Sequence, residues 1–138
     1  MAYWLFKTEP ETWGWEQQAK KGAPEEWNGV RNYQARNNMR EMKLGELGFF
    51  YHSVKEKAVV GIVRVAALAH PDSTTDDPRW ECVDVEAVRP FERPVTLEEI
   101  KANPRLKDMV LVNNSRLSVQ PVTEAEWKIV CEMGGTEP

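Results

Sequence analysis

Hydrophobic and polar positions alternate along much of the chain with the two-residue period of β-strands. The clearest case is Trp80–Phe91, where Val83, Val85 and Ala87 alternate with acidic residues, a pattern typical of a half-exposed strand. Further runs rich in β-branched, aromatic or other apolar residues predict additional strands. These are Tyr3–Lys7, Leu47–Ser53, Ala58–Leu68, Met109–Val112 and Leu117–Val119. Prolines and aspartates at 71–72 and 77–78 mark a loop before the alternating strand.

Helix-capping residues predict a few short helices between and after these strands. Thr96 precedes Glu99, and Thr123 precedes Glu126, at the spacing of a capping box. Asn32 can cap another helix, and a glycine at position 22 can end a further one. The expected helices are Trp15–Lys21, Asn32–Met42, Thr96–Ala102 and Thr123–Met133. The combination predicts an α+β fold with a mixed, strongly curved sheet and short helices at its ends.

Length and composition favour one folded domain over residues 1–138. A chain of 138 residues with 41% hydrophobic content can bury one real core. No apolar run approaches the roughly 20 residues of a membrane helix, and the apolar N-terminus is too short for a signal peptide. Cys82 and Cys131 lie far apart and are expected to be free thiols in a reducing cytosol. We therefore expect a cytoplasmic monomer with no membrane partner.

Charge is distributed unevenly along the sequence. The net charge is −4, but residues 31–64 carry seven Lys or Arg against three Glu, or +4. Residues 65–138 carry −6 and residues 1–30 carry −2. Because phosphate binding requires a local basic face and not a basic protein, the middle segment is compatible with a nucleic-acid partner. By itself, this distribution favours an ordinary solvated surface.

The sequence offers little support for catalysis or for a cofactor. Two histidines, His52 and His70, and two distant cysteines do not provide the ligand spacing of a zinc motif. No glycine-rich nucleotide-binding loop is present. His52 and Ser53 are neighbours in a predicted strand and therefore point to opposite faces, so they cannot form a nucleophile–base pair directly. We expect no metal, no cofactor and no enzyme activity.

Tryptophan is the unusual feature of the composition, with six in the chain. Trp4, Trp80 and Trp127 lie in predicted strands or an amphipathic helix, where packing is the ordinary role. Trp27 differs because it precedes a polar, glycine-containing turn that leads into the basic segment. A flat ring beside such a turn and next to arginines is what a base-stacking platform requires.

Five segments, in order along nearly the whole chain, resemble the EVE domain family. The opening segment is Lys7–Trp13, in which Thr8 stands where the family usually has serine. The central motif is Trp27–Asn37, and the C-terminal motif is Asn114–Val122. Matching middle strands (50–53 and 60–62) and a Met-Gly-Gly ending complete the set.

The resemblance implies a PUA-like curved β-barrel, similar to PUA, ASCH and, more closely, YTH domains. YTH domains bind N6-methyladenosine in RNA through an aromatic cage, and EVE domains are thought to read modified bases in DNA or RNA. We therefore expect this chain to hold one modified base of a nucleic acid, a methylated one, in an aromatic pocket.

Particular residues are expected to form that site, with Trp27 as one wall and Tyr51 or a ring at 49–50 as another. The expected base pocket consists of Thr8, Glu9, Trp27, Asn28, Gly29, Val30, Tyr51, His52, Ser53, Ser115 and Leu117. The expected phosphate-binding residues are Lys7, Arg31, Arg36 and Arg116. Structural ion pairs are the alternative role for Arg31, Arg116 and Glu9.

Two other function classes stay open at this point. The chain could be an enzyme that processes a modified nucleotide with Glu9 and His52. It could also be an interaction subunit without a small ligand, in which case side chains would fill the space beside Trp27.

Overall fold

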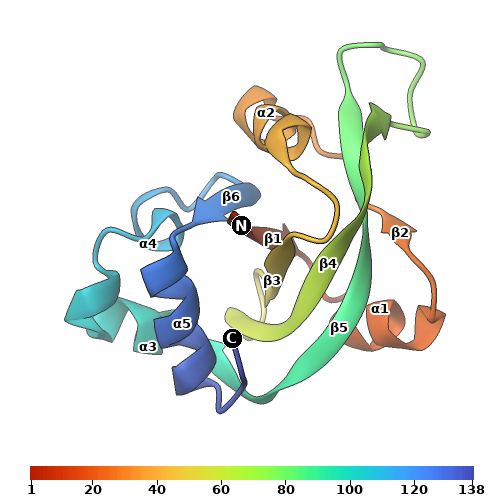
Figure 1. The fold of residues 1–138 in the computed structure, drawn as a ribbon. Coiled ribbons are helices and arrows are strands. Elements are labelled where there is room, and N and C mark those ends of the chain that lie inside the picture. Colours follow the sequence, from red (N-terminus) through yellow and green to blue (C-terminus); the bar gives the residue numbers. More distant parts are fainter.

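Six strands form one curved sheet in the computed structural model, which describes residues 1–138 (Figure 1). The strand order is β2-β5-β4-β3-β1-β6. The strands are β1 (Tyr3–Thr8), β2 (Glu25–Glu26), β3 (Leu47–His52), β4 (Ala58–Pro71), β5 (Glu81–Thr96) and β6 (Val119–Val122). The predicted α+β class with a mixed sheet is confirmed, since β1 pairs with β3 in parallel and the other pairs are antiparallel.

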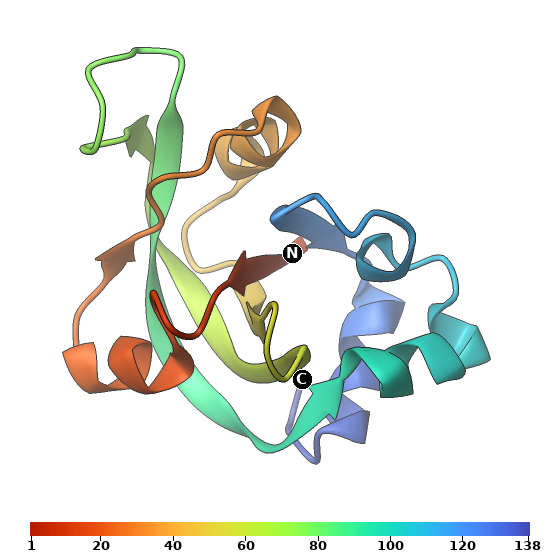
Figure 2. The same ribbon diagram turned by 180° about the vertical axis from the view of Figure 1, so that it is seen from behind.

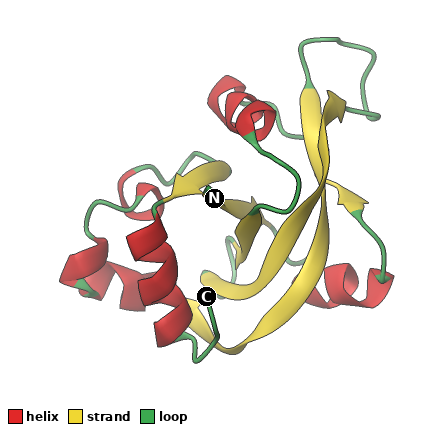
Figure 3. Ribbon diagram, viewed as in Figure 1, coloured by secondary structure: helices red, strands yellow, loops and turns green.

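The sheet is open, so the expected barrel is not confirmed. Its edge strands are β2 and β6, which do not pair with each other. The curvature comes mainly from the long β4–β5 hairpin, which bends across the whole domain (Figure 3). Its register shifts at four places, between Val59 and His70 on β4. Such irregularities bend a strand and increase its twist.

Helices cover the ends of the sheet, as the capping residues predict. The four expected helices are present as α1 (Trp15–Lys21), α2 (Tyr33–Glu41), α3 (Leu97–Ala102) and α5 (Glu124–Met133). Asn32, Thr96 and Thr123 each accept a backbone hydrogen bond at the start of a helix. Figures 1 and 2 show α5 and α3 on one side of the molecule, α1 on the opposite side and α2 at the top between them. None of these helices has the length and apolar character needed to cross a membrane.

Three strand predictions differ from the structure. The expected strand Met109–Val112 is wrong: a 3-10 turn, η1 (Pro104–Leu106), is followed there by a single helical turn, α4 (Val110–Asn113). The strand expected at Leu117 begins instead at Val119. β5 continues to Thr96, beyond the expected end at Phe91.

The apolar interior has two clusters, and β3 contributes to both. Phe49 and Tyr51 belong to a cluster around Trp127, which we call the closed cluster because α3 and α5 cover it. Phe50 belongs to a cluster around Trp27, which we call the open cluster. Alternating side chains of one strand point to opposite faces, which is why neighbouring rings enter different clusters.

Candidate nucleic-acid interface

A cavity of about 330 Å³ opens beside the open cluster, next to Trp27. Its size lies within the range of roughly 300–1,000 Å³ typical of ligand sites. Segments far apart in the sequence converge on it: the end of β1, the loop before α1, the segment from β2 to α2, and the residue before β6. The lining residues are Lys7, Thr8, Thr12, Trp13, Glu25, Glu26, Trp27, Asn28, Gly29, Val30, Arg31 and Ser118.

Two indole rings border the cavity. Trp27 is only 7% exposed and packs edge-on against Phe6 and Phe50, with ring centroids 5.3 and 5.6 Å away. Trp13 is half-buried, and its indole N–H donates to Gln18 Oε1 at 2.9 Å. Because core contacts hold Trp27 and a hydrogen bond holds Trp13, both rings are fixed in place before any ligand arrives.

A buried carboxylate fixes the loop that follows Trp27. Asp72 is 2% exposed and accepts hydrogen bonds from the backbone amide of Gly29 at 2.8 Å and from Arg31 at 3.1 Å. Burial alone would raise the pKa of Asp72, but the hydroxyl and amide of Thr74, the Gly29 amide and Arg31 outweigh it and lower that pKa to about 2. Gly29 has φ = +80°, a conformation that favours glycine.

The polar groups of the cavity wall include hydrogen-bonding groups with no partner in the protein. The backbone amides of Asn28 and Val30 make no intramolecular hydrogen bond, and neither does the Asn28 side chain. Lys7 donates to the Ser115 carbonyl at 2.8 Å, and burial lowers the pKa of its ammonium. Glu26 supplies a nearby carboxylate. The wall can therefore donate to, and accept from, the edge of one planar ligand between apolar rings.

The structure brings together seven of the expected site residues and places the others elsewhere. Lys7, Thr8, Trp27, Asn28, Gly29, Val30 and Arg31 line the cavity. Tyr51, expected there, lies in the closed cluster on the opposite face of β3, and Leu117 is buried in the open cluster without reaching the cavity.

The other expected residues also lie outside the cavity wall. His52 accepts a hydrogen bond from the Trp15 amide, and burial lowers its pKa. The Ser53 amide donates to the Thr8 carbonyl. Glu9, Ser115 and Arg116 are exposed. Arg116 makes no ion pair. Arg31 pairs with Asp72, which is the structural ion pair considered as the alternative role for this arginine.

Sequence reasoning did not identify Thr12, Trp13, Glu25, Glu26 or Ser118 as wall residues. Trp13 lies in the same opening segment as Thr8, whose hydroxyl donates to the Trp13 carbonyl at 2.8 Å. Because Trp13 lies in the same short segment as Thr8, the sequence could have suggested that Trp13 also lines the site.

An aromatic pair, of which one ring is exposed and the other half-buried, lies near the mouth of the cavity. Tyr33 is 50% exposed and stacks on Trp80, with ring centroids 5.0 Å apart. The guanidinium of Arg31 lies 5.4 Å from the Trp80 ring centre, and that of Arg36 lies 4.9 Å from the Tyr33 ring centre. Arg40 is paired with Glu81, but Arg36 has no carboxylate partner. This surface combines stacked rings with cations, a combination that suits a nucleic-acid strand.

The fold and the indole-lined cavity define a small α+β domain with a ligand site at one end of an open sheet. The EVE domain model matches residues 2–133, and the chain therefore belongs to the EVE domain family. Thymocyte nuclear protein 1 of Mus musculus is 38% identical to it, and the match covers 99% of this chain and 75% of the mouse protein. The predicted family membership is confirmed.

Several solved structures resemble the whole chain. Protein Atu2648 from Agrobacterium tumefaciens is 59% identical with a TM-score of 0.97, covering 99% of this chain and 94% of that one. Human THYN1, crystallised in complex with DNA containing 5-methylcytosine, is 37% identical with a TM-score of 0.89, and both chains are covered completely.

A more distant likeness concerns the fold alone. The YTH domain of the Zygosaccharomyces rouxii MRB1 protein has a TM-score of 0.57 and 16% identity, covering 96% of this chain and 86% of that one. The expected relationship to the YTH fold is thus confirmed at the level of architecture.

Proposed function

We propose that this chain binds nucleic acid containing a methylated base and holds that base in the cavity between Trp13 and Trp27. The observation that carries the proposal is the convergence of separate segments on one cavity that has indole walls and unbonded backbone amides. It is supported by the human relative of the same fold, whose structure contains DNA with 5-methylcytosine. DNA with 5-methylcytosine is therefore the first ligand to test.

The proposed energetics follow from the cavity wall. Removing a base from its stack costs a few kcal/mol, which the site must offset. Stacking on aromatic rings contributes roughly 1–3 kcal/mol per base, and burying a methyl carbon adds about 0.8 kcal/mol. The amides of Asn28 and Val30 would contact the base edge, as Thr8 and Ser118 would from the other segments. No chemical step is required, so the proposed protein is a reader and not an enzyme.

The surface around the Tyr33–Trp80 pair is the proposed path of the flanking strand. Arg36 supplies a guanidinium that no carboxylate neutralises. Lys7 lines the cavity, but its ammonium lies 5.9 Å from the Tyr51 ring centre and donates to the Ser115 carbonyl. Arg36, more than Lys7 or the paired Arg31 and Arg40, would contact phosphates.

The test compares two tryptophans that lie two positions apart. Trp13 and Trp15 are both half-buried, but only Trp13 lines the cavity, whereas Trp15 packs edge-on against Phe50. Binding is measured by fluorescence anisotropy on matched oligonucleotides with cytosine, 5-methylcytosine, adenine or N6-methyladenine. We expect Trp13→Ala to weaken binding of the preferred methylated oligonucleotide about five-fold to a hundred-fold, and Trp15→Ala to leave it nearly unchanged.

Three results would contradict the proposal. One is that no methylated oligonucleotide binds better than its unmethylated counterpart. Another is that Trp13→Ala and Trp15→Ala weaken binding equally. The third is a change in oligonucleotide mass after incubation with the protein, which would favour an enzyme.

A further inference from the structure

A row of metal-ligating side chains crosses three neighbouring strands behind the cavity. Glu26 lies on β2, Cys82 on β5 and His70 on β4, and one ligand atom from each lies within 4.8 Å of the others. His70 and Cys82 are direct partners across the β4–β5 pair. We propose that these three side chains bind a divalent transition-metal ion with the preferences of zinc.

The donor set fits zinc in type and in spacing. Thiolate, imidazole and carboxylate are its usual protein ligands, at bond lengths of about 2.0–2.3 Å, so donors of a tetrahedral site lie roughly 3.3–3.8 Å apart. The ligand atoms lie within 4.8 Å of one another, so binding an ion would require them to move closer together by side-chain rotation. His70 Nε2 lies 2.7 Å from Asp84 Oδ1, and a bound ion would replace the proton between them, with a water molecule as its fourth ligand.

Hydrogen bonds around the row already orient its members. His70 Nδ1 lies 2.9 Å from the carbonyl oxygen of Pro71, so that a proton on Nδ1 would leave Nε2 for the metal. One carboxylate oxygen of Glu26 accepts from the amide and the hydroxyl of Ser73, at 3.1 and 2.6 Å. Outer contacts of this kind, to a backbone carbonyl and to a ligating carboxylate, are typical of metal sites.

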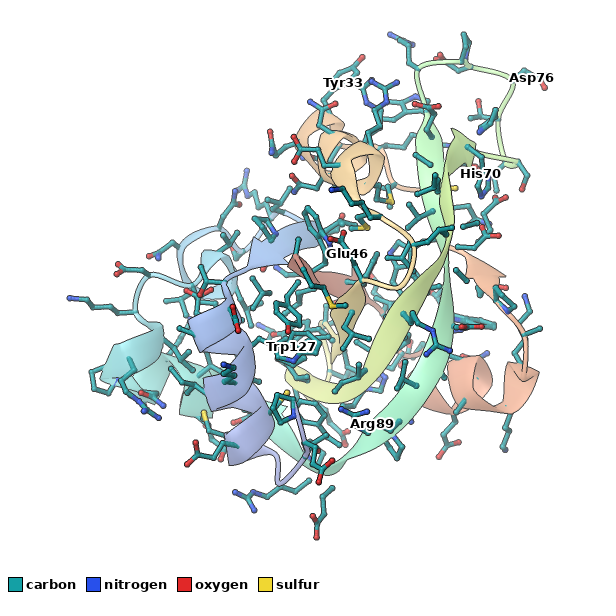
Figure 4. The ribbon with its side chains drawn as sticks, viewed as in Figure 1. Tyr33, Glu46, His70, Asp76, Arg89 and Trp127 are labelled. Atoms are coloured by element: carbon teal, nitrogen blue, oxygen red, sulfur yellow. The ribbon has the colours of Figure 1, made fainter.

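The charge around the buried thiol suits a cation. Cys82 is fully buried and has no hydrogen-bond partner. The carboxylates of Glu26, Asp72 and Asp84 surround the thiol and are only partly offset by Arg31. These negative surroundings attract a divalent ion, which would in turn stabilise the thiolate. The His70 side chain is 32% exposed, so an ion can enter from solvent, and Figure 4 shows His70 on the outer part of the hairpin.

Sequence spacing did not suggest this site and led us to expect no metal. Residues 26, 70 and 82 form no spaced motif. They become neighbours only through the pairing of β5 with β2 and with β4. The glutamate also lines the cavity, so a bound ion would fix one part of the cavity wall. The metal proposal nevertheless stands independently of the proposed function.

The test uses cobalt as a spectroscopic substitute for zinc in the complete chain after removal of metals by a chelator. Cobalt bound to a thiolate gives a charge-transfer absorption band in the near ultraviolet. We expect this band in the parent protein at one ion per chain, its loss in Cys82→Ser, and its retention in Cys131→Ser. Cys131 is the matched control because it is also a buried free cysteine. Zinc should displace the cobalt and abolish the band.

Two conservative variants test the other ligands. We expect Glu26→Gln and His70→Asn each to weaken zinc binding, measured by competition with a chelator, by at least ten-fold. Absence of the cobalt band in the parent, or its persistence in Cys82→Ser, would overturn the proposal. If Cys82→Ser does not fold, unchanged zinc affinity in both Glu26→Gln and His70→Asn would also overturn it.

Discussion

Trp127 and Trp27 occupy the same kind of position in the two apolar clusters, yet their rings are covered differently. Trp127 has no exposed surface and lies flat on Phe49, with centroids 4.0 Å apart at 11°, and on Tyr3 at 4.6 Å (Figure 4). Trp27 is 7% exposed and meets Phe6 and Phe50 only by edge contacts. Its remaining surface borders the cavity.

The difference lies in what closes each cluster. Helix α5, which carries Trp127 itself, covers the closed cluster with apolar side chains. No helix covers the open cluster at the cavity, where a polar loop bound to Asp72 takes that place. Trp27 can therefore contact a ligand because a polar loop covers it, whereas Trp127 cannot because an apolar helix covers it.

The largest expected effect is on stability. Trp127→Ala should lower the free energy of unfolding by about 3–5 kcal/mol, because it removes a fully buried ring. Trp27→Ala should cost about 3 kcal/mol, at the lower end of that range, since one side of its ring already borders a cavity. Chemical denaturation measures both. A ring that is only 7% exposed is not one whose removal leaves the stability of the fold unchanged.

Binding separates these two variants further. Trp27→Ala should also weaken binding of a methylated oligonucleotide, whereas the folded fraction of Trp127→Ala should bind like the parent. Equal binding losses in the two folded variants would mean that the clusters do not differ in function.

A smaller loss of stability is expected from removing the charge of Asp72, which holds the polar loop over the open cluster. The folded-state pKa of Asp72 is about 2, below the ordinary value of 3.8. A depressed carboxyl pKa stabilises the fold above the unfolded-state pKa, and this contribution is lost as pH falls through the folded-state pKa. Asp72→Asn should therefore cost about 2 kcal/mol at pH 7. The difference from the parent should shrink between about pH 4 and pH 2, as followed by urea denaturation at each pH.

Asp76 provides the control for this measurement. It is exposed in the same loop, is labelled in Figure 4 and makes no hydrogen bond through its side chain. Asp76→Asn should change stability by no more than about 0.5 kcal/mol. A pH-independent cost for Asp72→Asn would show that the charge of Asp72 does not hold the loop.

The smallest expected effect concerns the charge beside the open cluster. Arg36→Gln removes a guanidinium without a carboxylate partner and should reduce the slope of log affinity against log salt by about 0.7 for a single-stranded ligand. Arg105→Gln removes an equal charge from η1, on the side of the closed cluster, and should leave the slope unchanged. Equal slopes in all three proteins would contradict a phosphate contact at Arg36.

Helices with explicit capping residues were predictable from the sequence, whereas two strand predictions failed for identifiable reasons. The Thr96 and Thr123 capping boxes define the starts of α3 and α5. The Val-Leu-Val run of α4 has high strand propensity, but tertiary context gives it one helical turn. The strand expected to end at Phe91 continues to Thr96, and its proline at position 90 is tolerated because β2 pairs only near Asp84 and leaves that part of β5 as a sheet edge.

The candidate site was only partly predictable, because sequence motifs do not specify which face of a strand a side chain occupies. Trp27 and the loop after it were predictable, since the motif and the cavity wall coincide. Either Tyr51 or a ring at 49–50 was expected beside Trp27, and the pleat of β3 directs Phe50 there and Tyr51 to the opposite face. A one-residue difference in register exchanges the two faces, and the sequence alone did not determine it.

The parallel pairing of β1 with β3 has a consequence for the order in which the molecule assembles. Strands β4 and β5 are consecutive and can pair early, through a local hairpin. Strand β1 must wait for a crossover of residues 9–46 that contains α1, β2 and α2, and such non-local pairings form slowly. The cavity is built from β1, this crossover and a residue near the C-terminal end of the chain. During refolding, amide protons of the hairpin should therefore gain protection from exchange before those of Lys7 and Trp27, and binding capacity should return with the later phase.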